Sequence, residues 1–323
     1  MLAAHPYPEH VESRVSSMVE RPIARDWRRF VALGDSFTEG LVDEVRPDGR
    51  HRGWADRVAQ ALADRALLHG GDGIEYANLA VRGRLVREVI AEQVPAATAM
   101  APDLASIAVG VNDSLRPRFD LNPLATALES GVRELRSSGC DVLLFAFGDP
   151  GRRSRDMAPV RERIRAYNSA VRAIALHYDC YLVSFWEVAA YDDDRLWDED
   201  RLHLSPAGHQ LAAHTALEAL GMGDPGWRTP LVPGPRPSPV VRAGSHVRWT
   251  TGHLAPWIVR RARGESSGDQ VLPKHPSAIR LPGEVASHEN TKYNAGIRFQ
   301  RRTPCHAAPP DRTGPVRSRA DRS

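Results

Sequence analysis

The sequence predicts an α/β protein with three α/β/α layers, in which helices cover both faces of a parallel five-stranded sheet. Two observations support this fold class. Short apolar runs typical of strands alternate along the chain with longer segments typical of helices. The runs, such as VLLFAF, are apolar throughout rather than at every second residue, as expected of strands that are covered on both sides. The strands are expected at residues 30–33, 74–79, 104–109, 142–147 and 181–185.

Helices are expected between these strands and after the last one. The final helix has the clearest start, because Ser205 can cap it and Pro206 suits its first position. Since the crossovers in such a sheet are right-handed, the carboxyl ends of all the strands meet at one edge. The helices are expected at residues 53–67, 84–98, 121–137, 158–178 and 206–220.

Composition divides the chain into four regions. Residues 1–26 are expected to form a disordered N-terminal extension, and residues 27–221 a single catalytic domain. Residues 222–269 are rich in Pro and Gly at first, and then carry apolar residues at helical spacing over 245–262. We expect this short helix to pack on the domain, with a lid or membrane-surface element as the alternative. Residues 270–323 lack periodicity and carry excess basic residues, so we expect a disordered tail.

Charge and cysteine content limit the classes of function. The net charge of +3 is small, and the basic tail has few aromatic residues, so binding to nucleic acid is not expected. No apolar run is long enough to cross a membrane, and the N-terminus lacks the apolar core of a signal peptide. The three cysteines fit a reducing compartment, and their spacing does not suggest a zinc site. We therefore expect a cytoplasmic protein without a metal.

A serine follows the first expected strand, in the tripeptide Gly34-Asp35-Ser36. A serine flanked by small residues at the carboxyl end of a buried strand lies where nucleophiles cluster in open α/β sheets. The tripeptide alone is equally compatible with an ordinary turn. Its interpretation therefore depends on the rest of the chain.

Asp200 and His203 lie three residues apart, just before the last expected helix. At this spacing the carboxylate can hold the histidine ring in one tautomer, which leaves the other ring nitrogen free to face a serine. His209, on the helix itself, is expected to have a surface or packing role. The pair predicts a general base for Ser36.

A glycine and an asparagine follow two further strands. Gly83 lets the backbone come close to a ligand, so that its N–H can donate to developing negative charge. The side-chain amide of Asn112 can do the same. Either residue alone is typical of a turn. Four such features at successive strand ends favour a catalytic site over coincidence.

These segments resemble the sequence blocks of the SGNH, or GDSL-type, hydrolase family of esterases and lipases. The matching stretches are GDSFTEG, NLAVRG, GVND and DRLH, within about residues 27–221. The resemblance implies a flavodoxin-like SGNH hydrolase fold, and the longer C-terminal part is similar to bacterial, actinobacterial members. It implies a triad of Ser36, Asp200 and His203, and an oxyanion hole of the Ser36 N–H, the Gly83 N–H and the Asn112 amide.

The predicted reaction is the hydrolysis of a carboxylic ester by acyl transfer, for which no metal or organic cofactor is required. The substrate is expected to be a small-molecule, lipid or sugar ester, with the acyl chain and the alcohol left open. Asp35 and Asp113 adjoin the predicted site and are candidates for supporting roles. The alternative is a non-catalytic carbohydrate- or partner-binding protein on the same fold.

Overall fold

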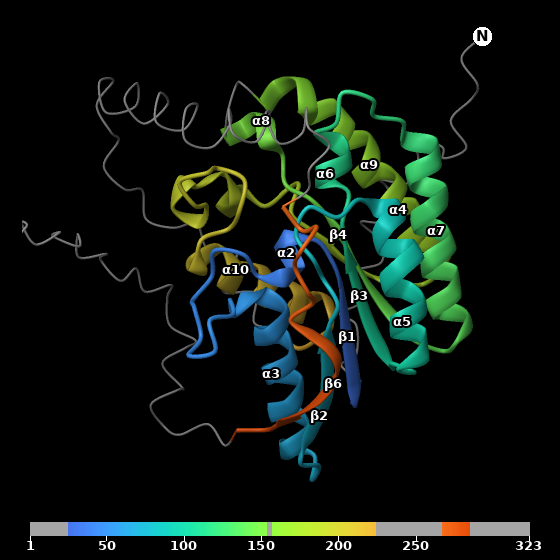
Figure 1. Cartoon of the computed structure of the whole chain (residues 1–323), viewed down its shortest axis with the longest axis vertical. Coiled ribbons are helices and arrows are strands. Elements are labelled where there is room, and N and C mark those ends of the chain that lie inside the picture. The colour runs from blue at the N-terminus through green and yellow to red at the C-terminus, as the bar shows by residue number, and fades with distance from the viewer. Residues whose placement is uncertain (1–24, 154–156, 224–266, 285–323) are drawn as a thin grey trace, which may run out of the picture.

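The computed structural model describes residues 25–153, 157–223 and 267–284, which form a six-stranded sheet between two layers of helices (Figure 1). The strand order is β5-β4-β3-β1-β2-β6. Five strands are parallel, and β6 pairs antiparallel with β2. The strands are β1 (Arg29–Gly34), β2 (Gly73–Asn78), β3 (Leu104–Ala108), β4 (Asp141–Ala146), β5 (Tyr181–Ser184) and β6 (His275–Pro282).

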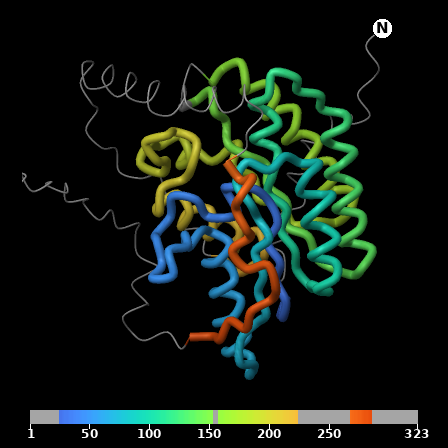
Figure 2. The backbone as a smooth tube through the Cα atoms, in the orientation of Figure 1, coloured from blue at the N-terminus to red at the C-terminus, as the bar shows by residue number. Residues whose placement is uncertain are grey.

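Helices α3 and α10 pack together on one face of the sheet, and α4, α5, α7 and α9 cover the other (Figures 1 and 2). All five expected helices are present, although the second is divided by a π-helical turn, η1. The α-helices are α2 (Ser36–Glu39), α3 (Gly53–Leu68), α4 (Val86–Glu88), α5 (Val94–Ala99), α6 (Val111–Ser114), α7 (Leu121–Ser137), α8 (Pro150–Arg153), α9 (Ala158–His177) and α10 (Pro206–Ala219), and the other turns are η1 (Val89–Gln93), η3 (Ala189–Asp192) and η4 (Asp194–Leu196).

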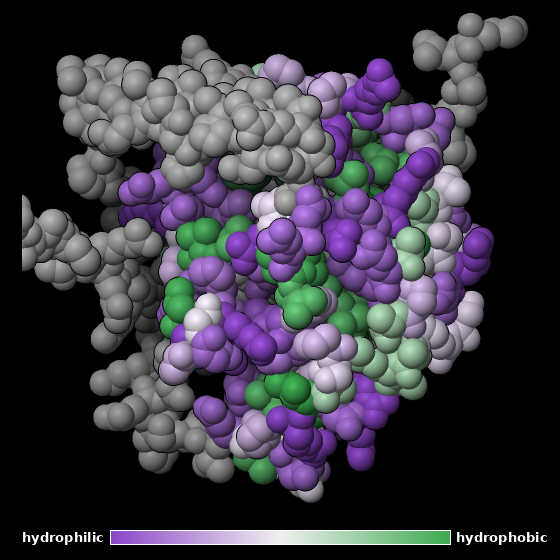
Figure 3. All heavy atoms as spheres, in the orientation of Figure 1, coloured by the Kyte–Doolittle hydropathy of each residue, from purple (hydrophilic) through white to green (hydrophobic). Residues whose placement is uncertain are grey.

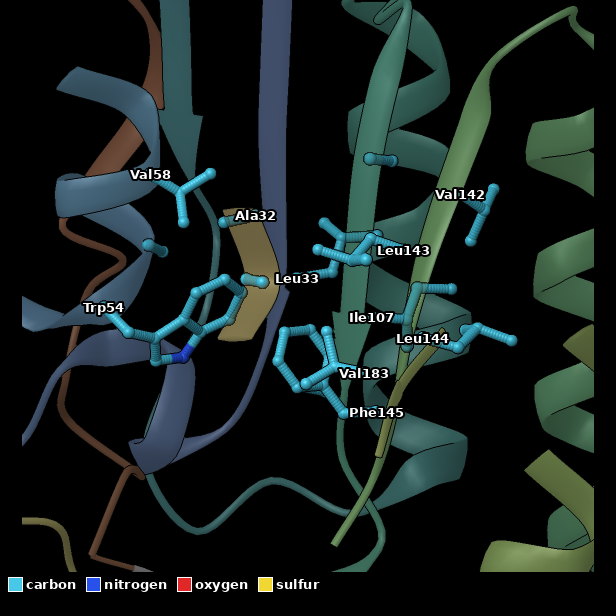
Figure 4. Packing of buried hydrophobic residues seen from close by; sticks show 14 of the residues in the cluster. Ala32, Leu33, Trp54, Val58, Ile107, Val142, Leu143, Leu144, Phe145 and Val183 are labelled. Atoms are coloured by element: carbon cyan, nitrogen blue, oxygen red, sulfur yellow. The ribbon is translucent and has the colours of Figure 1, made fainter. Parts of the chain in front are cut away.

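The hydrophobic core lies on both sides of the central strands. Every residue of β3 and β4 is buried, which explains why these strands are mostly apolar. Figure 4 shows Trp54 of α3 close to Phe145 of β4, and their ring centroids are 4.7 Å apart. Burial of one such side chain contributes about 1.5–3 kcal/mol to stability. The packed sheet thus provides a rigid support for the loops at its carboxyl edge.

The sixth strand corrects two expectations. The sheet is not purely parallel and five-stranded, and the region 270–323 is not disordered throughout, because β6 lies within it. Most side chains of β6 are exposed, so its sequence lacks an apolar pattern, and backbone pairing with β2 holds it in place. Pro276 lies where the pairing register shifts, a position that tolerates a missing N–H.

A buried ion pair anchors the start of this strand to helix α3. Lys274 Nζ donates to Asp56 Oδ2 at 2.6 Å and to the Arg52 carbonyl oxygen at 3.0 Å. The side chains of Lys274 and Asp56 are only 4% and 2% exposed. Burial raises the pKa of Asp56, and the positive charge of Lys274 acts in the opposite direction.

Several expectations lie outside the described residues: the extension up to residue 24, the helix at 245–262 and the tail after residue 284. No helix in the described ranges is both long enough and apolar enough to span a membrane. On the face shown in Figure 3, small groups of hydrophobic residues lie among hydrophilic ones. Residues that follow β1, β3 and β4 line one pocket together with the loop before α10, and this lining includes Ser36, Asn112 and His203.

Candidate active site

Ser36 is the first residue of α2, directly after β1. Asp35 caps this helix, with its Oδ1 accepting the Phe37 N–H at 3.0 Å. Gly34 has a φ of +149°, and a Cβ there would lie only 2.3 Å from the Ala108 carbonyl oxygen. The sharp turn that presents the Ser36 hydroxyl therefore requires glycine at this position.

Ser36, His203 and Asp200 form one hydrogen-bonded series. His203 Nε2 lies 3.0 Å from Ser36 Oγ, and its Nδ1 lies 2.5 Å from Asp200 Oδ2. Asp200 Oδ1 also accepts the backbone N–H groups of Leu202 and His203, both at 2.9 Å. The carboxylate thus fixes both the ring and the backbone of the histidine. The structure thus brings Ser36, His203 and Asp200, which were predicted from the sequence, into direct contact.

The loop between Asp200 and His203 keeps the carboxyl group ionised. Burial alone would raise the pKa of Asp200, but hydrogen bonds and the charge of His203 outweigh it and lower the pKa to about 2. Arg201 has a φ of +58°, in the left-handed region that non-glycine residues rarely adopt. Such backbone strain is common at functional sites, and here it lies beside the predicted base.

Asn112 approaches from α6, after β3. Its Nδ2 donates to Asp35 Oδ2 at 3.1 Å and to the Arg84 carbonyl oxygen at 3.2 Å. The amide is therefore held beside the turn that carries Ser36, and both residues line the same pocket. In this arrangement both N–H groups of the Asn112 amide already have acceptors.

Asp35 and Asp113 are buried carboxyl groups within this junction. Burial raises the pKa of Asp35 to about 7, against the opposing effects of the Phe37 N–H and of His203. Burial likewise raises the pKa of Asp113 to about 6, although its Oδ2 accepts the Val86 N–H at 3.1 Å. Asp35 touches the Asn112 amide, whereas Asp113 supports the start of α4.

Gly83 occupies the turn after β2, with a φ of +78°. Glu39, the last residue of α2, is 7% exposed and fixes this turn. Its carboxylate accepts the Arg82 backbone N–H at 2.8 Å and the Arg82 Nε–H at 3.0 Å. Glu39 therefore links helix α2 to the Gly83 turn. Gly83 is not among the described residues that line the pocket beside Ser36.

The pocket beside Ser36 is mainly apolar. Its lining comes from the ends of β4 and β5, from α9 and from the loop before α10. Asp149, also at the pocket, is fully buried and pairs with Arg161 Nε at 2.8 Å. The apolar residues of the lining are Phe37, Leu41, Val111, Phe147, Pro150, Met157, Ile164, Phe185, Tyr191, Trp197, Leu202 and Leu204.

Other polar residues near the pocket have structural partners. His209 is buried, stacks on Phe37, and directs Nε2 to the Leu41 carbonyl oxygen at 3.1 Å. Burial lowers the pKa of His209 to about 4, and the ring packs within the core side of the pocket wall. The guanidinium group of Arg152 lies 3.7 Å from the carboxylates of both Asp149 and Asp192. Within the described ranges no cluster of three His, Cys, Asp or Glu residues could hold a metal.

The sequence analysis missed Gln93, whose buried side chain contacts the backbone of Gly34. Gln93 directly follows the charged Glu92, and its only distinguishing feature in the sequence is its place two positions before Pro95. Glu39 carried no comparable signal in the sequence, and the structure shows that its side chain is buried.

Comparison with known proteins identifies the family that this site resembles. Residues 32–211 match the model of the GDSL-like Lipase/Acylhydrolase family, which is more than half of the chain. An acetylxylan esterase of Geobacillus stearothermophilus is 27% identical over 213 residues, covering 60% of this chain and 94% of that protein.

Solved structures agree on the fold. An acetyl xylan esterase variant from Geobacillus stearothermophilus superposes with a TM-score of 0.51 and 24% identity, over 61% of this chain and 96% of that one. An α/β hydrolase from the metagenome of Lake Arreo, Spain, gives a TM-score of 0.51 with 22% identity and the same coverage.

Proposed function

Because the chain belongs to the GDSL-like lipase/acylhydrolase family and is an ester hydrolase, we propose that it cleaves carboxylic esters by transferring the acyl group to Ser36. The observation that carries this proposal is the position of His203. Its ring lies within hydrogen-bond distance of Ser36 on one side and of Asp200 on the other. That arrangement suits a serine activated by a general base.

In the first half of the reaction, His203 Nε2 takes the proton of the Ser36 hydroxyl while Oγ attacks the ester carbonyl carbon. Asp200 holds Nδ1–H and stabilises the positive ring that forms. The protonated ring then donates its proton to the leaving alcohol, and an acyl-enzyme remains. In the second half, water attacks the acyl-enzyme with His203 again as the base, which releases the acid.

The negative charge of the tetrahedral intermediate needs donors that are already in place. We assign this role to the backbone N–H groups of Ser36 and Gly83 and to the Asn112 amide. The position of Asn112 in the same pocket as Ser36 supports its part in the assignment. To donate to the intermediate, its amide exchanges one of the bonds that it makes to Asp35 and Arg84. Loss of one such donor typically raises the barrier by about 2.7–4 kcal/mol.

Variants of the Geobacillus esterase offer independent support. Those described as catalytic mutants replace a serine, an aspartate and a histidine with alanine, and the last two residues lie three positions apart. Asp200 and His203 have the same order and spacing here. The parallel supports a common set of reacting groups.

The substrate is a small-molecule ester. The acetylxylan esterase relative makes an acetylated sugar one candidate. The apolar lining of the pocket favours a second candidate, an ester with an apolar group beside the carbonyl. Rates on p-nitrophenyl esters of increasing chain length, beside acetylated xylooligosaccharides, would distinguish the two.

The test of the nucleophile is Ser36→Ala. We expect this variant to fold normally and to lose nearly all hydrolysis of p-nitrophenyl acetate. A fluorophosphonate probe should label the unmodified protein at Ser36, as read by peptide mass spectrometry, and should not label the variant. Ser130→Ala, on helix α7, is the matched control and should keep full activity. Labelling at a different serine would refute the assignment.

A further inference from the structure

Two buried amide side chains hold strand ends in the same way. Gln93, only 6% exposed, accepts the Gly34 N–H at 2.8 Å and donates to the Gly34 carbonyl oxygen at 3.0 Å. Asn168 of α9 does the same with Phe147, at 2.9 and 2.7 Å. Gly34 lies two residues before Ser36, whereas Phe147 lines the pocket. The two amides therefore hold different parts of the site.

The bonds from Gln93 restrain the backbone that carries Ser36. A buried N–H group without a partner is costly, so the Gly34 N–H favours the position that Gln93 offers it. The Gly34 carbonyl oxygen is shared between Gln93 and the Val81 N–H, which lies 3.3 Å away. Two bonds from one planar amide fix the rotation of this strand end as well as its place. Ser36 Oγ must stay near His203 Nε2, now 3.0 Å away, for proton transfer.

A local irregularity delivers the Gln93 side chain. In η1 the Val94 N–H bonds to the Val89 carbonyl, which is the wider spacing of a π-helix. Pro95 follows at the start of α5 and has no N–H to offer Ala91, so the regular ladder of an α-helix cannot form there. The wider turn changes the direction in which Gln93 projects, and the amide reaches Gly34.

We propose that Gln93, presented by the π-helical turn, is the positioning residue that keeps the Ser36 hydroxyl in line with His203. The proposal rests on the proposed role of Ser36 as nucleophile. It assigns Gln93 to the chemical step and not to substrate binding. Asn168 holds the backbone of Phe147 in the same way, and Phe147 lines the pocket, so we expect Asn168 to affect substrate binding.

Gln93→Met is the direct test, because methionine fills a similar volume and makes neither bond. We expect kcat to fall by up to about 100-fold, the scale of a misplaced reacting group, while KM changes little. The rate of fluorophosphonate labelling of Ser36 should fall in parallel. Asn168→Leu is the matched comparison and should mainly raise KM. Val132→Ala, in α7, controls for lost stability and should keep kcat.

Pro95→Ala provides a second test that leaves the amide intact. The new N–H favours a regular α-helix, which turns Gln93 away from Gly34, so kcat should again fall with KM retained. If Gln93→Met does not fold, the result with Pro95→Ala decides. Wild-type kcat and labelling in the folded variants would overturn the proposal. Failure of the proposal that Ser36 is the nucleophile would be seen in a different experiment, because Ser36→Ala would then retain activity.

Discussion

The loop that holds Asp200 and the junction between β6 and α3 each pair a carboxylate with a basic side chain, but by different means. Asp200 receives two backbone N–H groups and a histidine ring, all from within three residues. Asp56 pairs with Lys274, which is 218 positions away in the sequence. The pKa of Asp200 is lowered to about 2, whereas burial raises that of Asp56.

The difference shows how far each charge depends on the rest of the fold. Asp200 stays ionised because its donors belong to its own turn, so the loop can hold His203 without distant help. Asp56 keeps a charged partner only while the C-terminal strand remains in place. Substitutions at the first pair should therefore change activity more than stability, and those at the second should do the reverse.

The largest effect is expected for Asp200→Asn. An amide cannot enforce the ring tautomer that His203 needs, so kcat should fall by about 10⁴-fold while the protein remains folded. Steady-state kinetics with p-nitrophenyl acetate, together with circular dichroism, would measure both. Asp194→Asn, an exposed residue a few positions earlier, is the control and should behave as wild type. A fully active Asp200→Asn protein would contradict the claim that the Asp200–His203 pair acts mainly on activity.

Lys274→Met should act mainly on stability. It leaves the Asp56 carboxylate buried without its cation, which typically costs about 3–5 kcal/mol of unfolding free energy. Urea unfolding would measure this loss, and kcat of the folded protein should stay within a few-fold. The double variant Lys274→Met with Asp56→Leu should recover much of the loss, because no buried charge remains. A single variant as stable as wild type would contradict the assigned role of the pair.

Asp35 extends the comparison to a carboxylate that has local donors and is nevertheless fully buried. Its pKa in the folded protein is raised from 3.8 to about 7. Between these values the unfolded chain binds fewer protons than the folded one, so the Asp35 contribution makes stability fall as pH rises from about 4 to about 7. Asp35→Asn should remove that contribution. Its unfolding free energy relative to wild type should rise across this window, and parallel curves would contradict the prediction.

The smallest effect is expected on β6 itself, at the ion pair between Arg280 and Asp72. Both side chains are at least half exposed, so water screens the interaction. Arg280→Ala should change stability by about 0–1 kcal/mol, less still at high salt, and leave activity unchanged. Thermal unfolding at low and high salt is the measurement. A loss as large as that of Lys274→Met would mean that the strand depends on its surface charges.

The sequence predicted the parts of the molecule whose physical signals are local. The apolar strands of the core, the glycine turn before Ser36 and the spacing of Asp200 and His203 depend on short stretches of chain. The helix start at Ser205 is equally local, and its Oγ accepts the Gly208 N–H at 3.3 Å. The turn at residues 82–84 is held by Glu39, a pairing across 43 positions that no short pattern indicated.

Features that depend on distant partners were not predictable. Strand β6 has an exposed, proline-containing sequence, and only the backbone of β2 makes it a strand. Lys274 resembles any surface lysine until Asp56 is seen beside it. Gln93 resembles a surface residue of an ordinary helix, because the π-helical turn that directs it inward arises from Pro95 in a folded context.

Strand β6 also has a consequence for how the protein behaves in concentrated solution. It covers the edge of β2, a strand of mostly buried residues whose open backbone groups would otherwise invite pairing with another chain. Pro276 and Arg280 make β6 itself a poorer template for such pairing. A cut after Lys274 removes this cover. The shortened protein should therefore aggregate through the exposed edge of β2, because β6 no longer prevents that edge from pairing with another chain.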